Sequence, residues 1–340
     1  MYDDLLFEDY QDVVFVASAG NSGKKFNLNE SQMKTIGNPA ACKNTLAVGA
    51  SLSDGNRIGP LDLGMDYLAL FSSRGPTSDN RMKPDIIAPG YTILTPNAHP
   101  QYKEDDTKEV YGTSYAAPVV AGNAALVRQY FEDGWFPCGS QGCGKAIKPS
   151  GALVKAVLMN GGQNLLRVQS ISRDKMLLEE LTPYDNSQGM GLVNLAASLP
   201  IKGTNNFKAI AKNNKPIKNG ERHTFFVRAR INEQCQSTEM SLTLSWYDKG
   251  AAMGCAKCLV NDLDVWVQQI TNINGKKRNG TKKRANGTKF KDWRNNVERV
   301  RFDMMNNRRY RITVKAANLS EEEIKYSLIA TGCFKIIPNQ

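Results

Sequence analysis

The sequence predicts an α/β domain with a mainly parallel sheet over residues 1–200, followed by an all-β sandwich or jelly roll over residues 201–340. Residues 12–19 form a continuous apolar run, which is typical of a buried parallel strand. Residues 114–131 carry apolar side chains at helical spacing. Beyond residue 200 the chain changes to short alternating strands joined by polar loops, a pattern that favours a sandwich. The predicted strands are 223–230, 241–246, 264–267, 310–314 and 326–330.

A serine stands at the start of the predicted helix, within Gly-Thr-Ser-Tyr-Ala-Ala-Pro-Val-Val-Ala-Gly from Gly112 to Gly122. We expect the helix to begin at or just after Ser114, because a first turn tolerates Pro118. The free N–H groups and the positive end of the helix dipole favour a developing negative charge there. Such an environment suits a nucleophilic serine in acyl transfer, and an ordinary N-capping serine is the alternative.

An asparagine follows the first predicted strand, in Gly20-Asn21-Ser22-Gly23. The glycines permit a tight turn and place Asn21 at the carboxyl end of the strand, where open α/β sheets bind ligands. A plain Asn-Gly turn is the alternative. Two further segments are residues 71–76 and 83–90, and each of them taken alone predicts only an ordinary turn and strand.

Together, in order and approximate spacing, these motifs resemble the subtilisin family of serine proteases. The serine segment is similar to the family pattern Gly-Thr-Ser-small-Ala-x-Pro-x-x-Ala-Gly, with Tyr115 where Met is usual. The resemblance implies that Ser114 is the nucleophile and Asn21 an oxyanion donor, with Gly112 and Thr113 in substrate binding. It also implies a sheet with helices on both faces and a polypeptide substrate.

The resemblance extends to the second region. Residues 189–195 resemble the glycine-bracketed turn that closes the family's catalytic domain, which places the domain boundary near residue 200. Residues 259–264 and 294–298 resemble the C-terminal β-domain of bacterial alkaline proteases and their amoebal relatives.

The aspartate and histidine of the family's triad have no counterpart here. Subtilisins carry the triad in the order Asp, His, Ser, and only twenty residues precede Asn21. His99 falls in a predicted loop and His223 opens a strand of the second region, so neither substitutes. A serine without a base is a weak nucleophile. We therefore expect that the N-terminal half of the catalytic domain is missing, and that this chain alone is inactive.

Two classes of function stay open at this point. The first is a subtilisin-type serine endopeptidase, represented here by part of its chain. The second is a non-catalytic pseudoprotease or adhesion-type binding module, in which the β-domain contacts a partner. An upstream in-frame Asp-x-Gly and His-Gly-Thr would support the first class, and a stop codon the second.

Charge and hydropathy limit the classes of partner that we expect for this chain. The net charge of +11 is concentrated in residues 276–278, 282–284 and 308–309, where Gly- and Asn-rich spacers favour a solvated surface over a nucleic-acid site. We expect no nucleic-acid partner. No apolar run is long enough to span a membrane, and the acidic N-terminus lacks signal-peptide features. Met1 is thus either a cytosolic start or not the true start of the gene.

The cysteines and sequons lean toward the secretory route. Cys255 and Cys258 form a CxxC without a second pair, so short-loop disulfides compete with a zinc site, and seven cysteines leave one over. Glycosylation sequons begin at Asn279, Asn286 and Asn318. We expect the full-length form to be secreted or in an endomembrane lumen.

A structural calcium ion is the one cofactor suggested. Asp262 and Asp264 alternate on a predicted strand, and Asp292 lies close to Asn295 and Asn296 in sequence. Oxygen ligands of this kind suit Ca²⁺, and the related β-domains look calcium-stabilised. Solvated loop carboxylates are the alternative.

Overall fold

The computed structural model describes residues 2–25, 31–54, 57–58, 61–62, 64–97, 106–172, 175–273 and 276–338. The chain divides into two compact units. We name the first the serine unit, Phe15–Asn123 with Gly162–Val193, because it contains Ser114. We name the second the sandwich unit, which is Met1–Val14, Ala124–Gly161 and Asn194–Gln340. Each unit is described by itself below.

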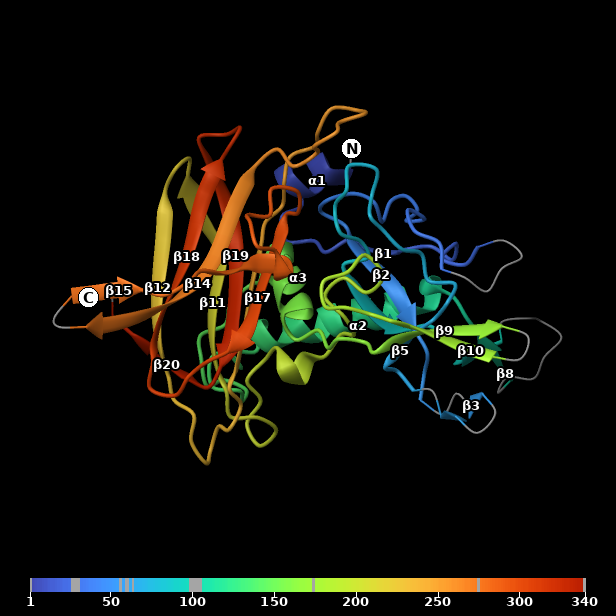
Figure 1. Cartoon of the computed structure of the whole chain (residues 1–340), viewed down its shortest axis with the longest axis horizontal. Coiled ribbons are helices and arrows are strands. Elements are labelled where there is room, and N and C mark those ends of the chain that lie inside the picture. Colours follow the sequence, from blue (N-terminus) through green and yellow to red (C-terminus); the bar gives the residue numbers. More distant parts are fainter. Residues whose placement is uncertain are drawn as a thin grey trace. The chain divides into compact units, whose positions relative to one another are not determined.

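The serine unit is built on a six-stranded mixed sheet with the order β1-β2-β5-β9-β10, and β6 pairs with β2 (Figure 1). Its strands are β1 (Val16–Ser18), β2 (Leu46–Ser51), β5 (Tyr67–Leu68), β6 (Ile86–Pro89), β9 (Arg167–Ser172) and β10 (Lys175–Glu180). The pairs β1–β2, β2–β6 and β5–β9 are parallel, whereas β2–β5 and β9–β10 are antiparallel. Two small hairpins complete the unit, β3 (Arg57–Ile58) with β4 (Leu61–Asp62) and β7 (Ile93–Pro96) with β8 (Thr107–Val110).

The predicted α/β class, a mainly parallel sheet with helices on both faces, is wrong. The described residues contain three α-helices, α1 (Tyr2–Glu8), α2 (Thr113–Glu132) and α3 (Gly151–Asn160), while strands dominate and most strand pairs are antiparallel. The connection between β1 and β2 is rich in Gly, Asn, Ser and Pro, which favour turns over helices. The apolar run of residues 12–19 yields only the three-residue strand β1.

Helix α2 differs from its prediction in one detail. It begins at Thr113, one residue before Ser114, and Pro118 lies inside it rather than in its first turn. Because proline has no backbone N–H, one intrahelical hydrogen bond is missing at that position.

The sandwich unit holds two antiparallel sheets, consistent with the predicted C-terminal β-domain (Figure 1). One has the order β11-β19-β13-β17, from β11 (Lys208–Lys218), β19 (Glu323–Gly332), β13 (Glu239–Ser245) and β17 (Val297–Asp303). The other has the order β15-β14-β18-β12-β20, from β15 (Lys276–Asn279), β14 (Asp262–Ile273), β18 (Arg309–Asn318), β12 (Arg222–Ala229) and β20 (Phe334–Ile337). Strand β16 (Lys283–Arg284) pairs with β14. Two short 3₁₀ helices are η1 (Leu195–Ala197) and η2 (Ala285–Gly287).

Alternating side chains from both sheets form one hydrophobic core, which includes Val227, Leu242, Val265, Ile312 and Leu328. These residues follow the period of two that a half-buried strand requires. The alternation in the sequence therefore specified which side of each strand faces the core.

Helix α3 belongs to the sandwich unit, and it packs against β13 and β19. All ten of its residues are buried, and Ser150 caps it by accepting a hydrogen bond from Leu153 N at 3.1 Å. At its other end, Asn160 donates to Thr331 Oγ1 at 2.8 Å and accepts from Thr243 Oγ1 at 3.0 Å. Helix α3 thus supplies hydrogen-bond partners for polar side chains of the sheet, in addition to apolar packing.

The predicted domain boundary near residue 200 stays a prediction. Limited proteolysis is expected to cut between residues 200 and 222, where the chain runs from η1 to β12 through turns and β11. Release of two stable pieces would support the boundary, and a single uncut core across this stretch would contradict it.

Candidate active site

Thr113 joins the two predicted catalytic residues. Its backbone N–H and its hydroxyl both donate to Asn21 Oδ1, at 2.9 and 3.0 Å. The same hydroxyl oxygen accepts from Gly20 N at 3.1 Å. Thr113 is 1% exposed, so these bonds are shielded from water. These three hydrogen bonds therefore connect the turn after β1 to the start of α2, next to Ser114.

The hydrogen bonds of Asn21 also orient its amide. A backbone N–H can only donate, so the oxygen of the amide must face Thr113. The NH₂ group of Asn21 then points the other way, on the side of Gly112. A Cβ built on Gly112 would lie 3.3 Å from Asn21 Nδ2, and the φ of +146° at Gly112 already favours glycine. Asn21 is thus positioned as a hydrogen-bond donor on an exposed surface.

Ser114 is exposed at the second position of α2. Its backbone N–H lies in the first helical turn, where N–H groups have no intrahelical acceptor. The approach to the helix is fixed by two hydrogen bonds of Gly112, from its N–H to Gly90 O at 2.8 Å and from Tyr115 N to its carbonyl at 3.0 Å. The local geometry matches the sequence expectation of a serine at a helix N-terminus.

Ser73 supports the Asn21 turn, a role that the sequence did not reveal. Its Oγ accepts from Ser22 N at 3.0 Å, and its N–H donates to Gly20 O at 2.8 Å. A Cβ on Gly20 would come within 2.8 Å of Ser73 Oγ, and the φ of Gly20 is +110°. Glycine is therefore required at position 20 for both space and backbone conformation.

Three aromatic rings gather beside this site. Phe71, Tyr91 and Tyr111 have ring centroids 5.9–6.2 Å apart, and Tyr111, next to Gly112, is 70% exposed. Each ring comes from a different segment of the serine unit, so no local spacing in the sequence indicates the cluster. The cluster places aromatic surface next to Gly112.

His223 is the one histidine among the residues that the structure describes. His223, in the sandwich unit, has both ring nitrogens engaged, Nδ1 with Tyr326 Oη at 2.8 Å and Nε2 with Glu221 Oε1 at 2.9 Å. His99 lies outside the described residues.

Comparison with known proteins decides the family. Residues 2–191, more than half of the chain, match the model of the subtilase family, Peptidase S8. This chain belongs to the subtilase family. It is thereby related to serine proteases of the subtilisin type, as the motifs around Ser114 predicted.

Individual relatives agree with this assignment. The chain is 25% identical over 305 residues to the serine protease/ABC transporter B family protein tagB of Dictyostelium discoideum, covering 77% of this chain and 16% of that protein. It is 29% identical over 294 residues to tagA of the same organism, covering 80% and 15%. It is 38% identical over 130 residues to the serine protease AprX of Bacillus subtilis (strain 168), covering 36% and 27%. The chain thus spans about a sixth of the length of the two amoebal relatives.

The predicted calcium ligands of this subtilase lie in the sandwich unit and are partly engaged. Asp264 Oδ2 accepts from Lys291 Nζ at 2.6 Å, and Asp292 accepts from Asn286 Nδ2 at 2.6 Å. Asp262 Oδ1 is buried without a hydrogen-bond partner, and burial, then the charge of Asp264, raises the pKa of Asp262 to about 6. Within the described ranges, no group of three or more His, Cys, Asp or Glu side chains is arranged to hold a metal ion. As they stand, these residues do not form a ready calcium cage, and the calcium hypothesis stays a prediction.

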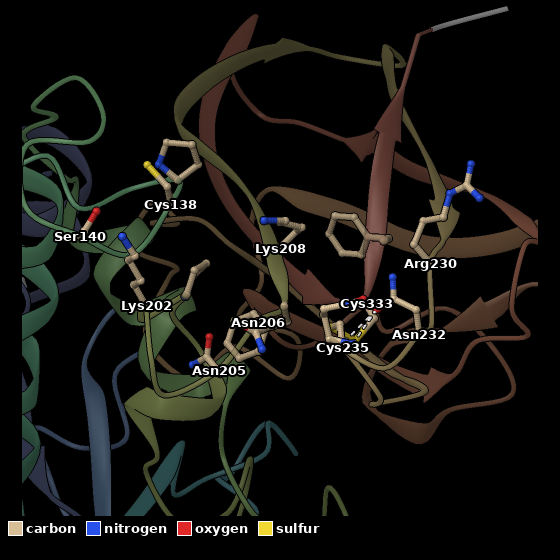
Figure 2. Close-up of a pocket in the computed structure, with 15 residues that line it drawn as sticks. Cys138, Ser140, Lys202, Asn205, Asn206, Lys208, Arg230, Asn232, Cys235 and Cys333 are labelled. Carbon is tan, nitrogen blue, oxygen red and sulfur yellow. Dashed lines mark hydrogen bonds between the residues drawn. A yellow bond between two sulfur atoms is a disulfide. The ribbon is translucent and has the colours of Figure 1, made fainter.

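The sandwich unit of this subtilase also contains a cavity of about 490 Å³. None of the predicted site residues lines it, and none of its 15 lining residues is acidic. Figure 2 shows Lys202, Lys208 and Arg230 around it, from the loop after η1, from β11 and from the residue after β12. The disulfide Cys235–Cys333 forms part of its wall.

The cysteine pattern is resolved into disulfides. Cys255 pairs with Cys258 within the CxxC, which confirms the short-loop alternative over a zinc site, and Cys138 pairs with Cys143. Cys42 lies outside the three disulfides. Among the described helices of this subtilase, none combines the length and the apolar character needed to cross a bilayer.

Proposed function

We propose that this chain is part of a serine endopeptidase that hydrolyses peptide bonds with Ser114 as nucleophile and Asn21 as oxyanion donor. Family membership supports peptide hydrolysis. The observation that carries the residue assignment is the pair of hydrogen bonds from Thr113 to Asn21 Oδ1, because they hold the Asn21 amide oxygen against the start of α2 and leave its NH₂ group facing away from Thr113.

The proposed chemistry uses these groups in order. Ser114 Oγ attacks the scissile carbonyl while a base accepts its proton, and the carbonyl oxygen becomes an oxyanion. Asn21 Nδ2 and the backbone N–H of Ser114 donate to that oxyanion, and the dipole of α2 stabilises it further. The amine leaves with a proton from the base, and water then releases the acyl group from Ser114 by the reverse steps.

We further propose that the chain of 340 residues has no peptidase activity when expressed alone. Acyl transfer requires removal of the Ser114 proton, and the ring nitrogens of His223 are engaged with Tyr326 and Glu221 in the other unit. Activity therefore requires the Asp and His segments of the family, supplied in cis or in trans.

The test uses the purified chain, a fluorophosphonate probe and, separately, casein. We expect neither labelling nor hydrolysis by the chain alone, and both when an upstream segment with the family's Asp and His motifs is co-expressed. Ser114→Ala should then abolish both signals, and Asn21→Ala should lower kcat far more than it raises KM. Stoichiometric labelling of Ser114 in the isolated chain would show that a base exists within it.

The second candidate, a non-catalytic binding module, draws its support from the sequence, which has no counterpart of the family's Asp and His motifs, and from the engagement of both His223 ring nitrogens. It predicts that the co-expressed segment restores no hydrolysis, and that Ser114→Ala leaves every property of the chain unchanged.

A further inference from the structure

One face of the sandwich unit gathers positive charge. In the sheet β15-β14-β18-β12-β20, Val227, Ile312 and Val265 belong to the core, so their sequence neighbours point to the opposite face. We name the cationic side chains on this outward side the cationic face. They are Arg222 and Arg228 of β12, Arg309, Arg311 and Lys315 of β18, Arg284 of β16 and Lys335 of β20.

The strand register sets like charges opposite one another on this face. Arg222 pairs with Lys315, and Arg228 pairs with Lys335. Like charges directly opposite on neighbouring strands destabilise a sheet. Asp264 is the one carboxylate in the outward positions of β12, β18 and β20 and of β14 from Leu263 onward, within the described residues. Its oxygen Oδ2 is already paired with Lys291 Nζ at 2.6 Å. Asp264 also lies directly opposite Lys315, so it offsets the like-charge pair of Arg222 and Lys315, whereas no carboxylate lies opposite the pair of Arg228 and Lys335 in the strand register.

Two guanidinium groups of the cationic face each have one nitrogen without a hydrogen-bond partner. The Nε atoms of Arg228 and Arg311 are buried without a hydrogen-bond acceptor, although Arg311 Nη2 donates to Gln268 Oε1 at 3.0 Å. A buried donor without an acceptor costs free energy, and the guanidinium groups keep their positive charge toward this face. The pKa of Lys282 is lowered by partial burial and then by the charges of Arg284 and Arg222, as expected in a positive field.

We propose that the cationic face binds a linear sulfated polysaccharide. Its guanidinium groups present planar forks that match the oxygens of a sulfate in two parallel hydrogen bonds. Outward positions recur about every 7 Å along a strand and about 5 Å between strands, so the face suits anions distributed along a chain better than one compact anion.

Two observations favour this polyanion over nucleic acid. Six of the seven cysteines form disulfides, which persist in oxidising compartments, where polyanions are chiefly sulfated glycans. Single-stranded nucleic acid is held by open aromatic rings. Trp266, on the outward side of β14, is only 7% exposed, and Lys282 Nζ lies over its ring at 4.4 Å.

The test compares two variants of the full chain that lose the same charge. The face variant carries Arg228→Gln, Arg311→Gln and Lys315→Gln. The control variant carries Lys202→Gln, Lys289→Gln and Lys325→Gln, which are exposed residues off the cationic face. Binding to immobilised heparin is measured at about 150 mM salt, where long-range charge effects are screened. We expect the face variant to bind roughly ten- to a hundredfold more weakly, and the control to change by less than about threefold.

Stability and competing probes complete the experiment. The melting temperature of the face variant should equal or exceed that of the parent, because opposed like charges are removed. Heparin stripped of sulfate should bind at least about tenfold more weakly than heparin. Equal weakening by both triple variants would overturn the proposal. Binding of polyglutamate, a single-stranded oligonucleotide or phosphatidylserine vesicles as tight as that of heparin would also overturn it.

Discussion

Different kinds of contact stabilise the interior of the serine unit and the interior of the sandwich unit. In the serine unit, the site depends on glycines with positive φ and on hydroxyls of Thr113 and Ser73 that bond backbone groups. In the sandwich unit, long antiparallel ladders enclose one core, and the Cys235–Cys333 disulfide links residues 98 positions apart. The first unit is specified by short motifs and the second by a repeating pattern, so single substitutions should act on them separately.

The largest effect is expected from the long-range disulfide. Replacing Cys235 and Cys333 by alanine should destabilise the sandwich unit by about 4.7 kcal/mol, because the bond constrains a loop of about 98 residues in the unfolded chain. Removing Cys138–Cys143, with a separation of 5, should cost about 2 kcal/mol. Urea unfolding followed by hydrogen exchange checks both values. An equal loss of unfolding free energy after removal of either disulfide would contradict the dependence of stability on loop length. A loss confined to the serine unit would contradict the assignment of this disulfide's effect to the sandwich unit.

A smaller effect is expected from Thr113→Val. Valine preserves the shape of the side chain but leaves the oxygen of Asn21 and the N–H of Gly20 each short of one bond, which should cost about 1–3 kcal/mol in the serine unit. Thr113→Ser keeps the hydroxyl and is the matched control. Hydrogen exchange should show faster opening around residues 16–21 in the valine variant alone. Unchanged hydrogen exchange at residues 16–21 would mean that the hydrogen bonds of the Thr113 hydroxyl do not stabilise the turn after β1.

A pH-dependent effect is expected at Asp262. Its pKa is raised to about 6 in the folded chain, so its contribution to stability is fully present below the unfolded pKa and is lost as pH rises through about 6. Asp262→Asn should therefore melt at a higher temperature than the parent near pH 7.5, and at the same temperature near pH 4. The control is Glu233→Gln, which neutralises an exposed carboxylate. Its melting temperature should differ from that of the parent by the same amount at both pH values.

The same variant sharpens the calcium hypothesis. If Ca²⁺ binds Asp262, millimolar calcium should raise the melting temperature of the parent at neutral pH and leave Asp262→Asn unchanged. A parent whose melting temperature is the same in calcium and in chelator would contradict the hypothesis.

The smallest effect on stability is expected from glycosylation. In a secretory host, the exposed Asn318 should carry a glycan and Asn286 should not. The amide of Asn286 is buried, donating to Asp292 Oδ2 at 2.6 Å and to Val297 O at 3.0 Å. Peptide mass mapping after enzymatic deglycosylation checks both sites. A glycan on Asn286 would mean that transfer precedes folding of this region.

Some of these features follow from sequence and others do not. The roles of Ser114 and Asn21 stay predictions, which rest on chemistry carried by contiguous motifs. The strand pattern of the sandwich unit could be predicted because alternation is a local property. The fold class was wrong because it assumed helices between strands where the chain contains turn-forming residues. The roles of Thr113 and Ser73 depend on contacts between segments about 50 to 90 residues apart, which no spacing reveals.

Helix α3 has a consequence for the order in which the chain is made. All ten residues of Gly151–Asn160 are buried in the folded unit, but β13 begins only at Glu239 and β19 ends at Gly332. At about 5–20 residues per second, the ribosome delivers the end of β19 on the order of ten to thirty seconds after α3. During that interval the apolar residues of α3 lack the sheet that later covers them. The nascent chain therefore presents a short apolar helix to chaperones before its own sheet exists to receive it.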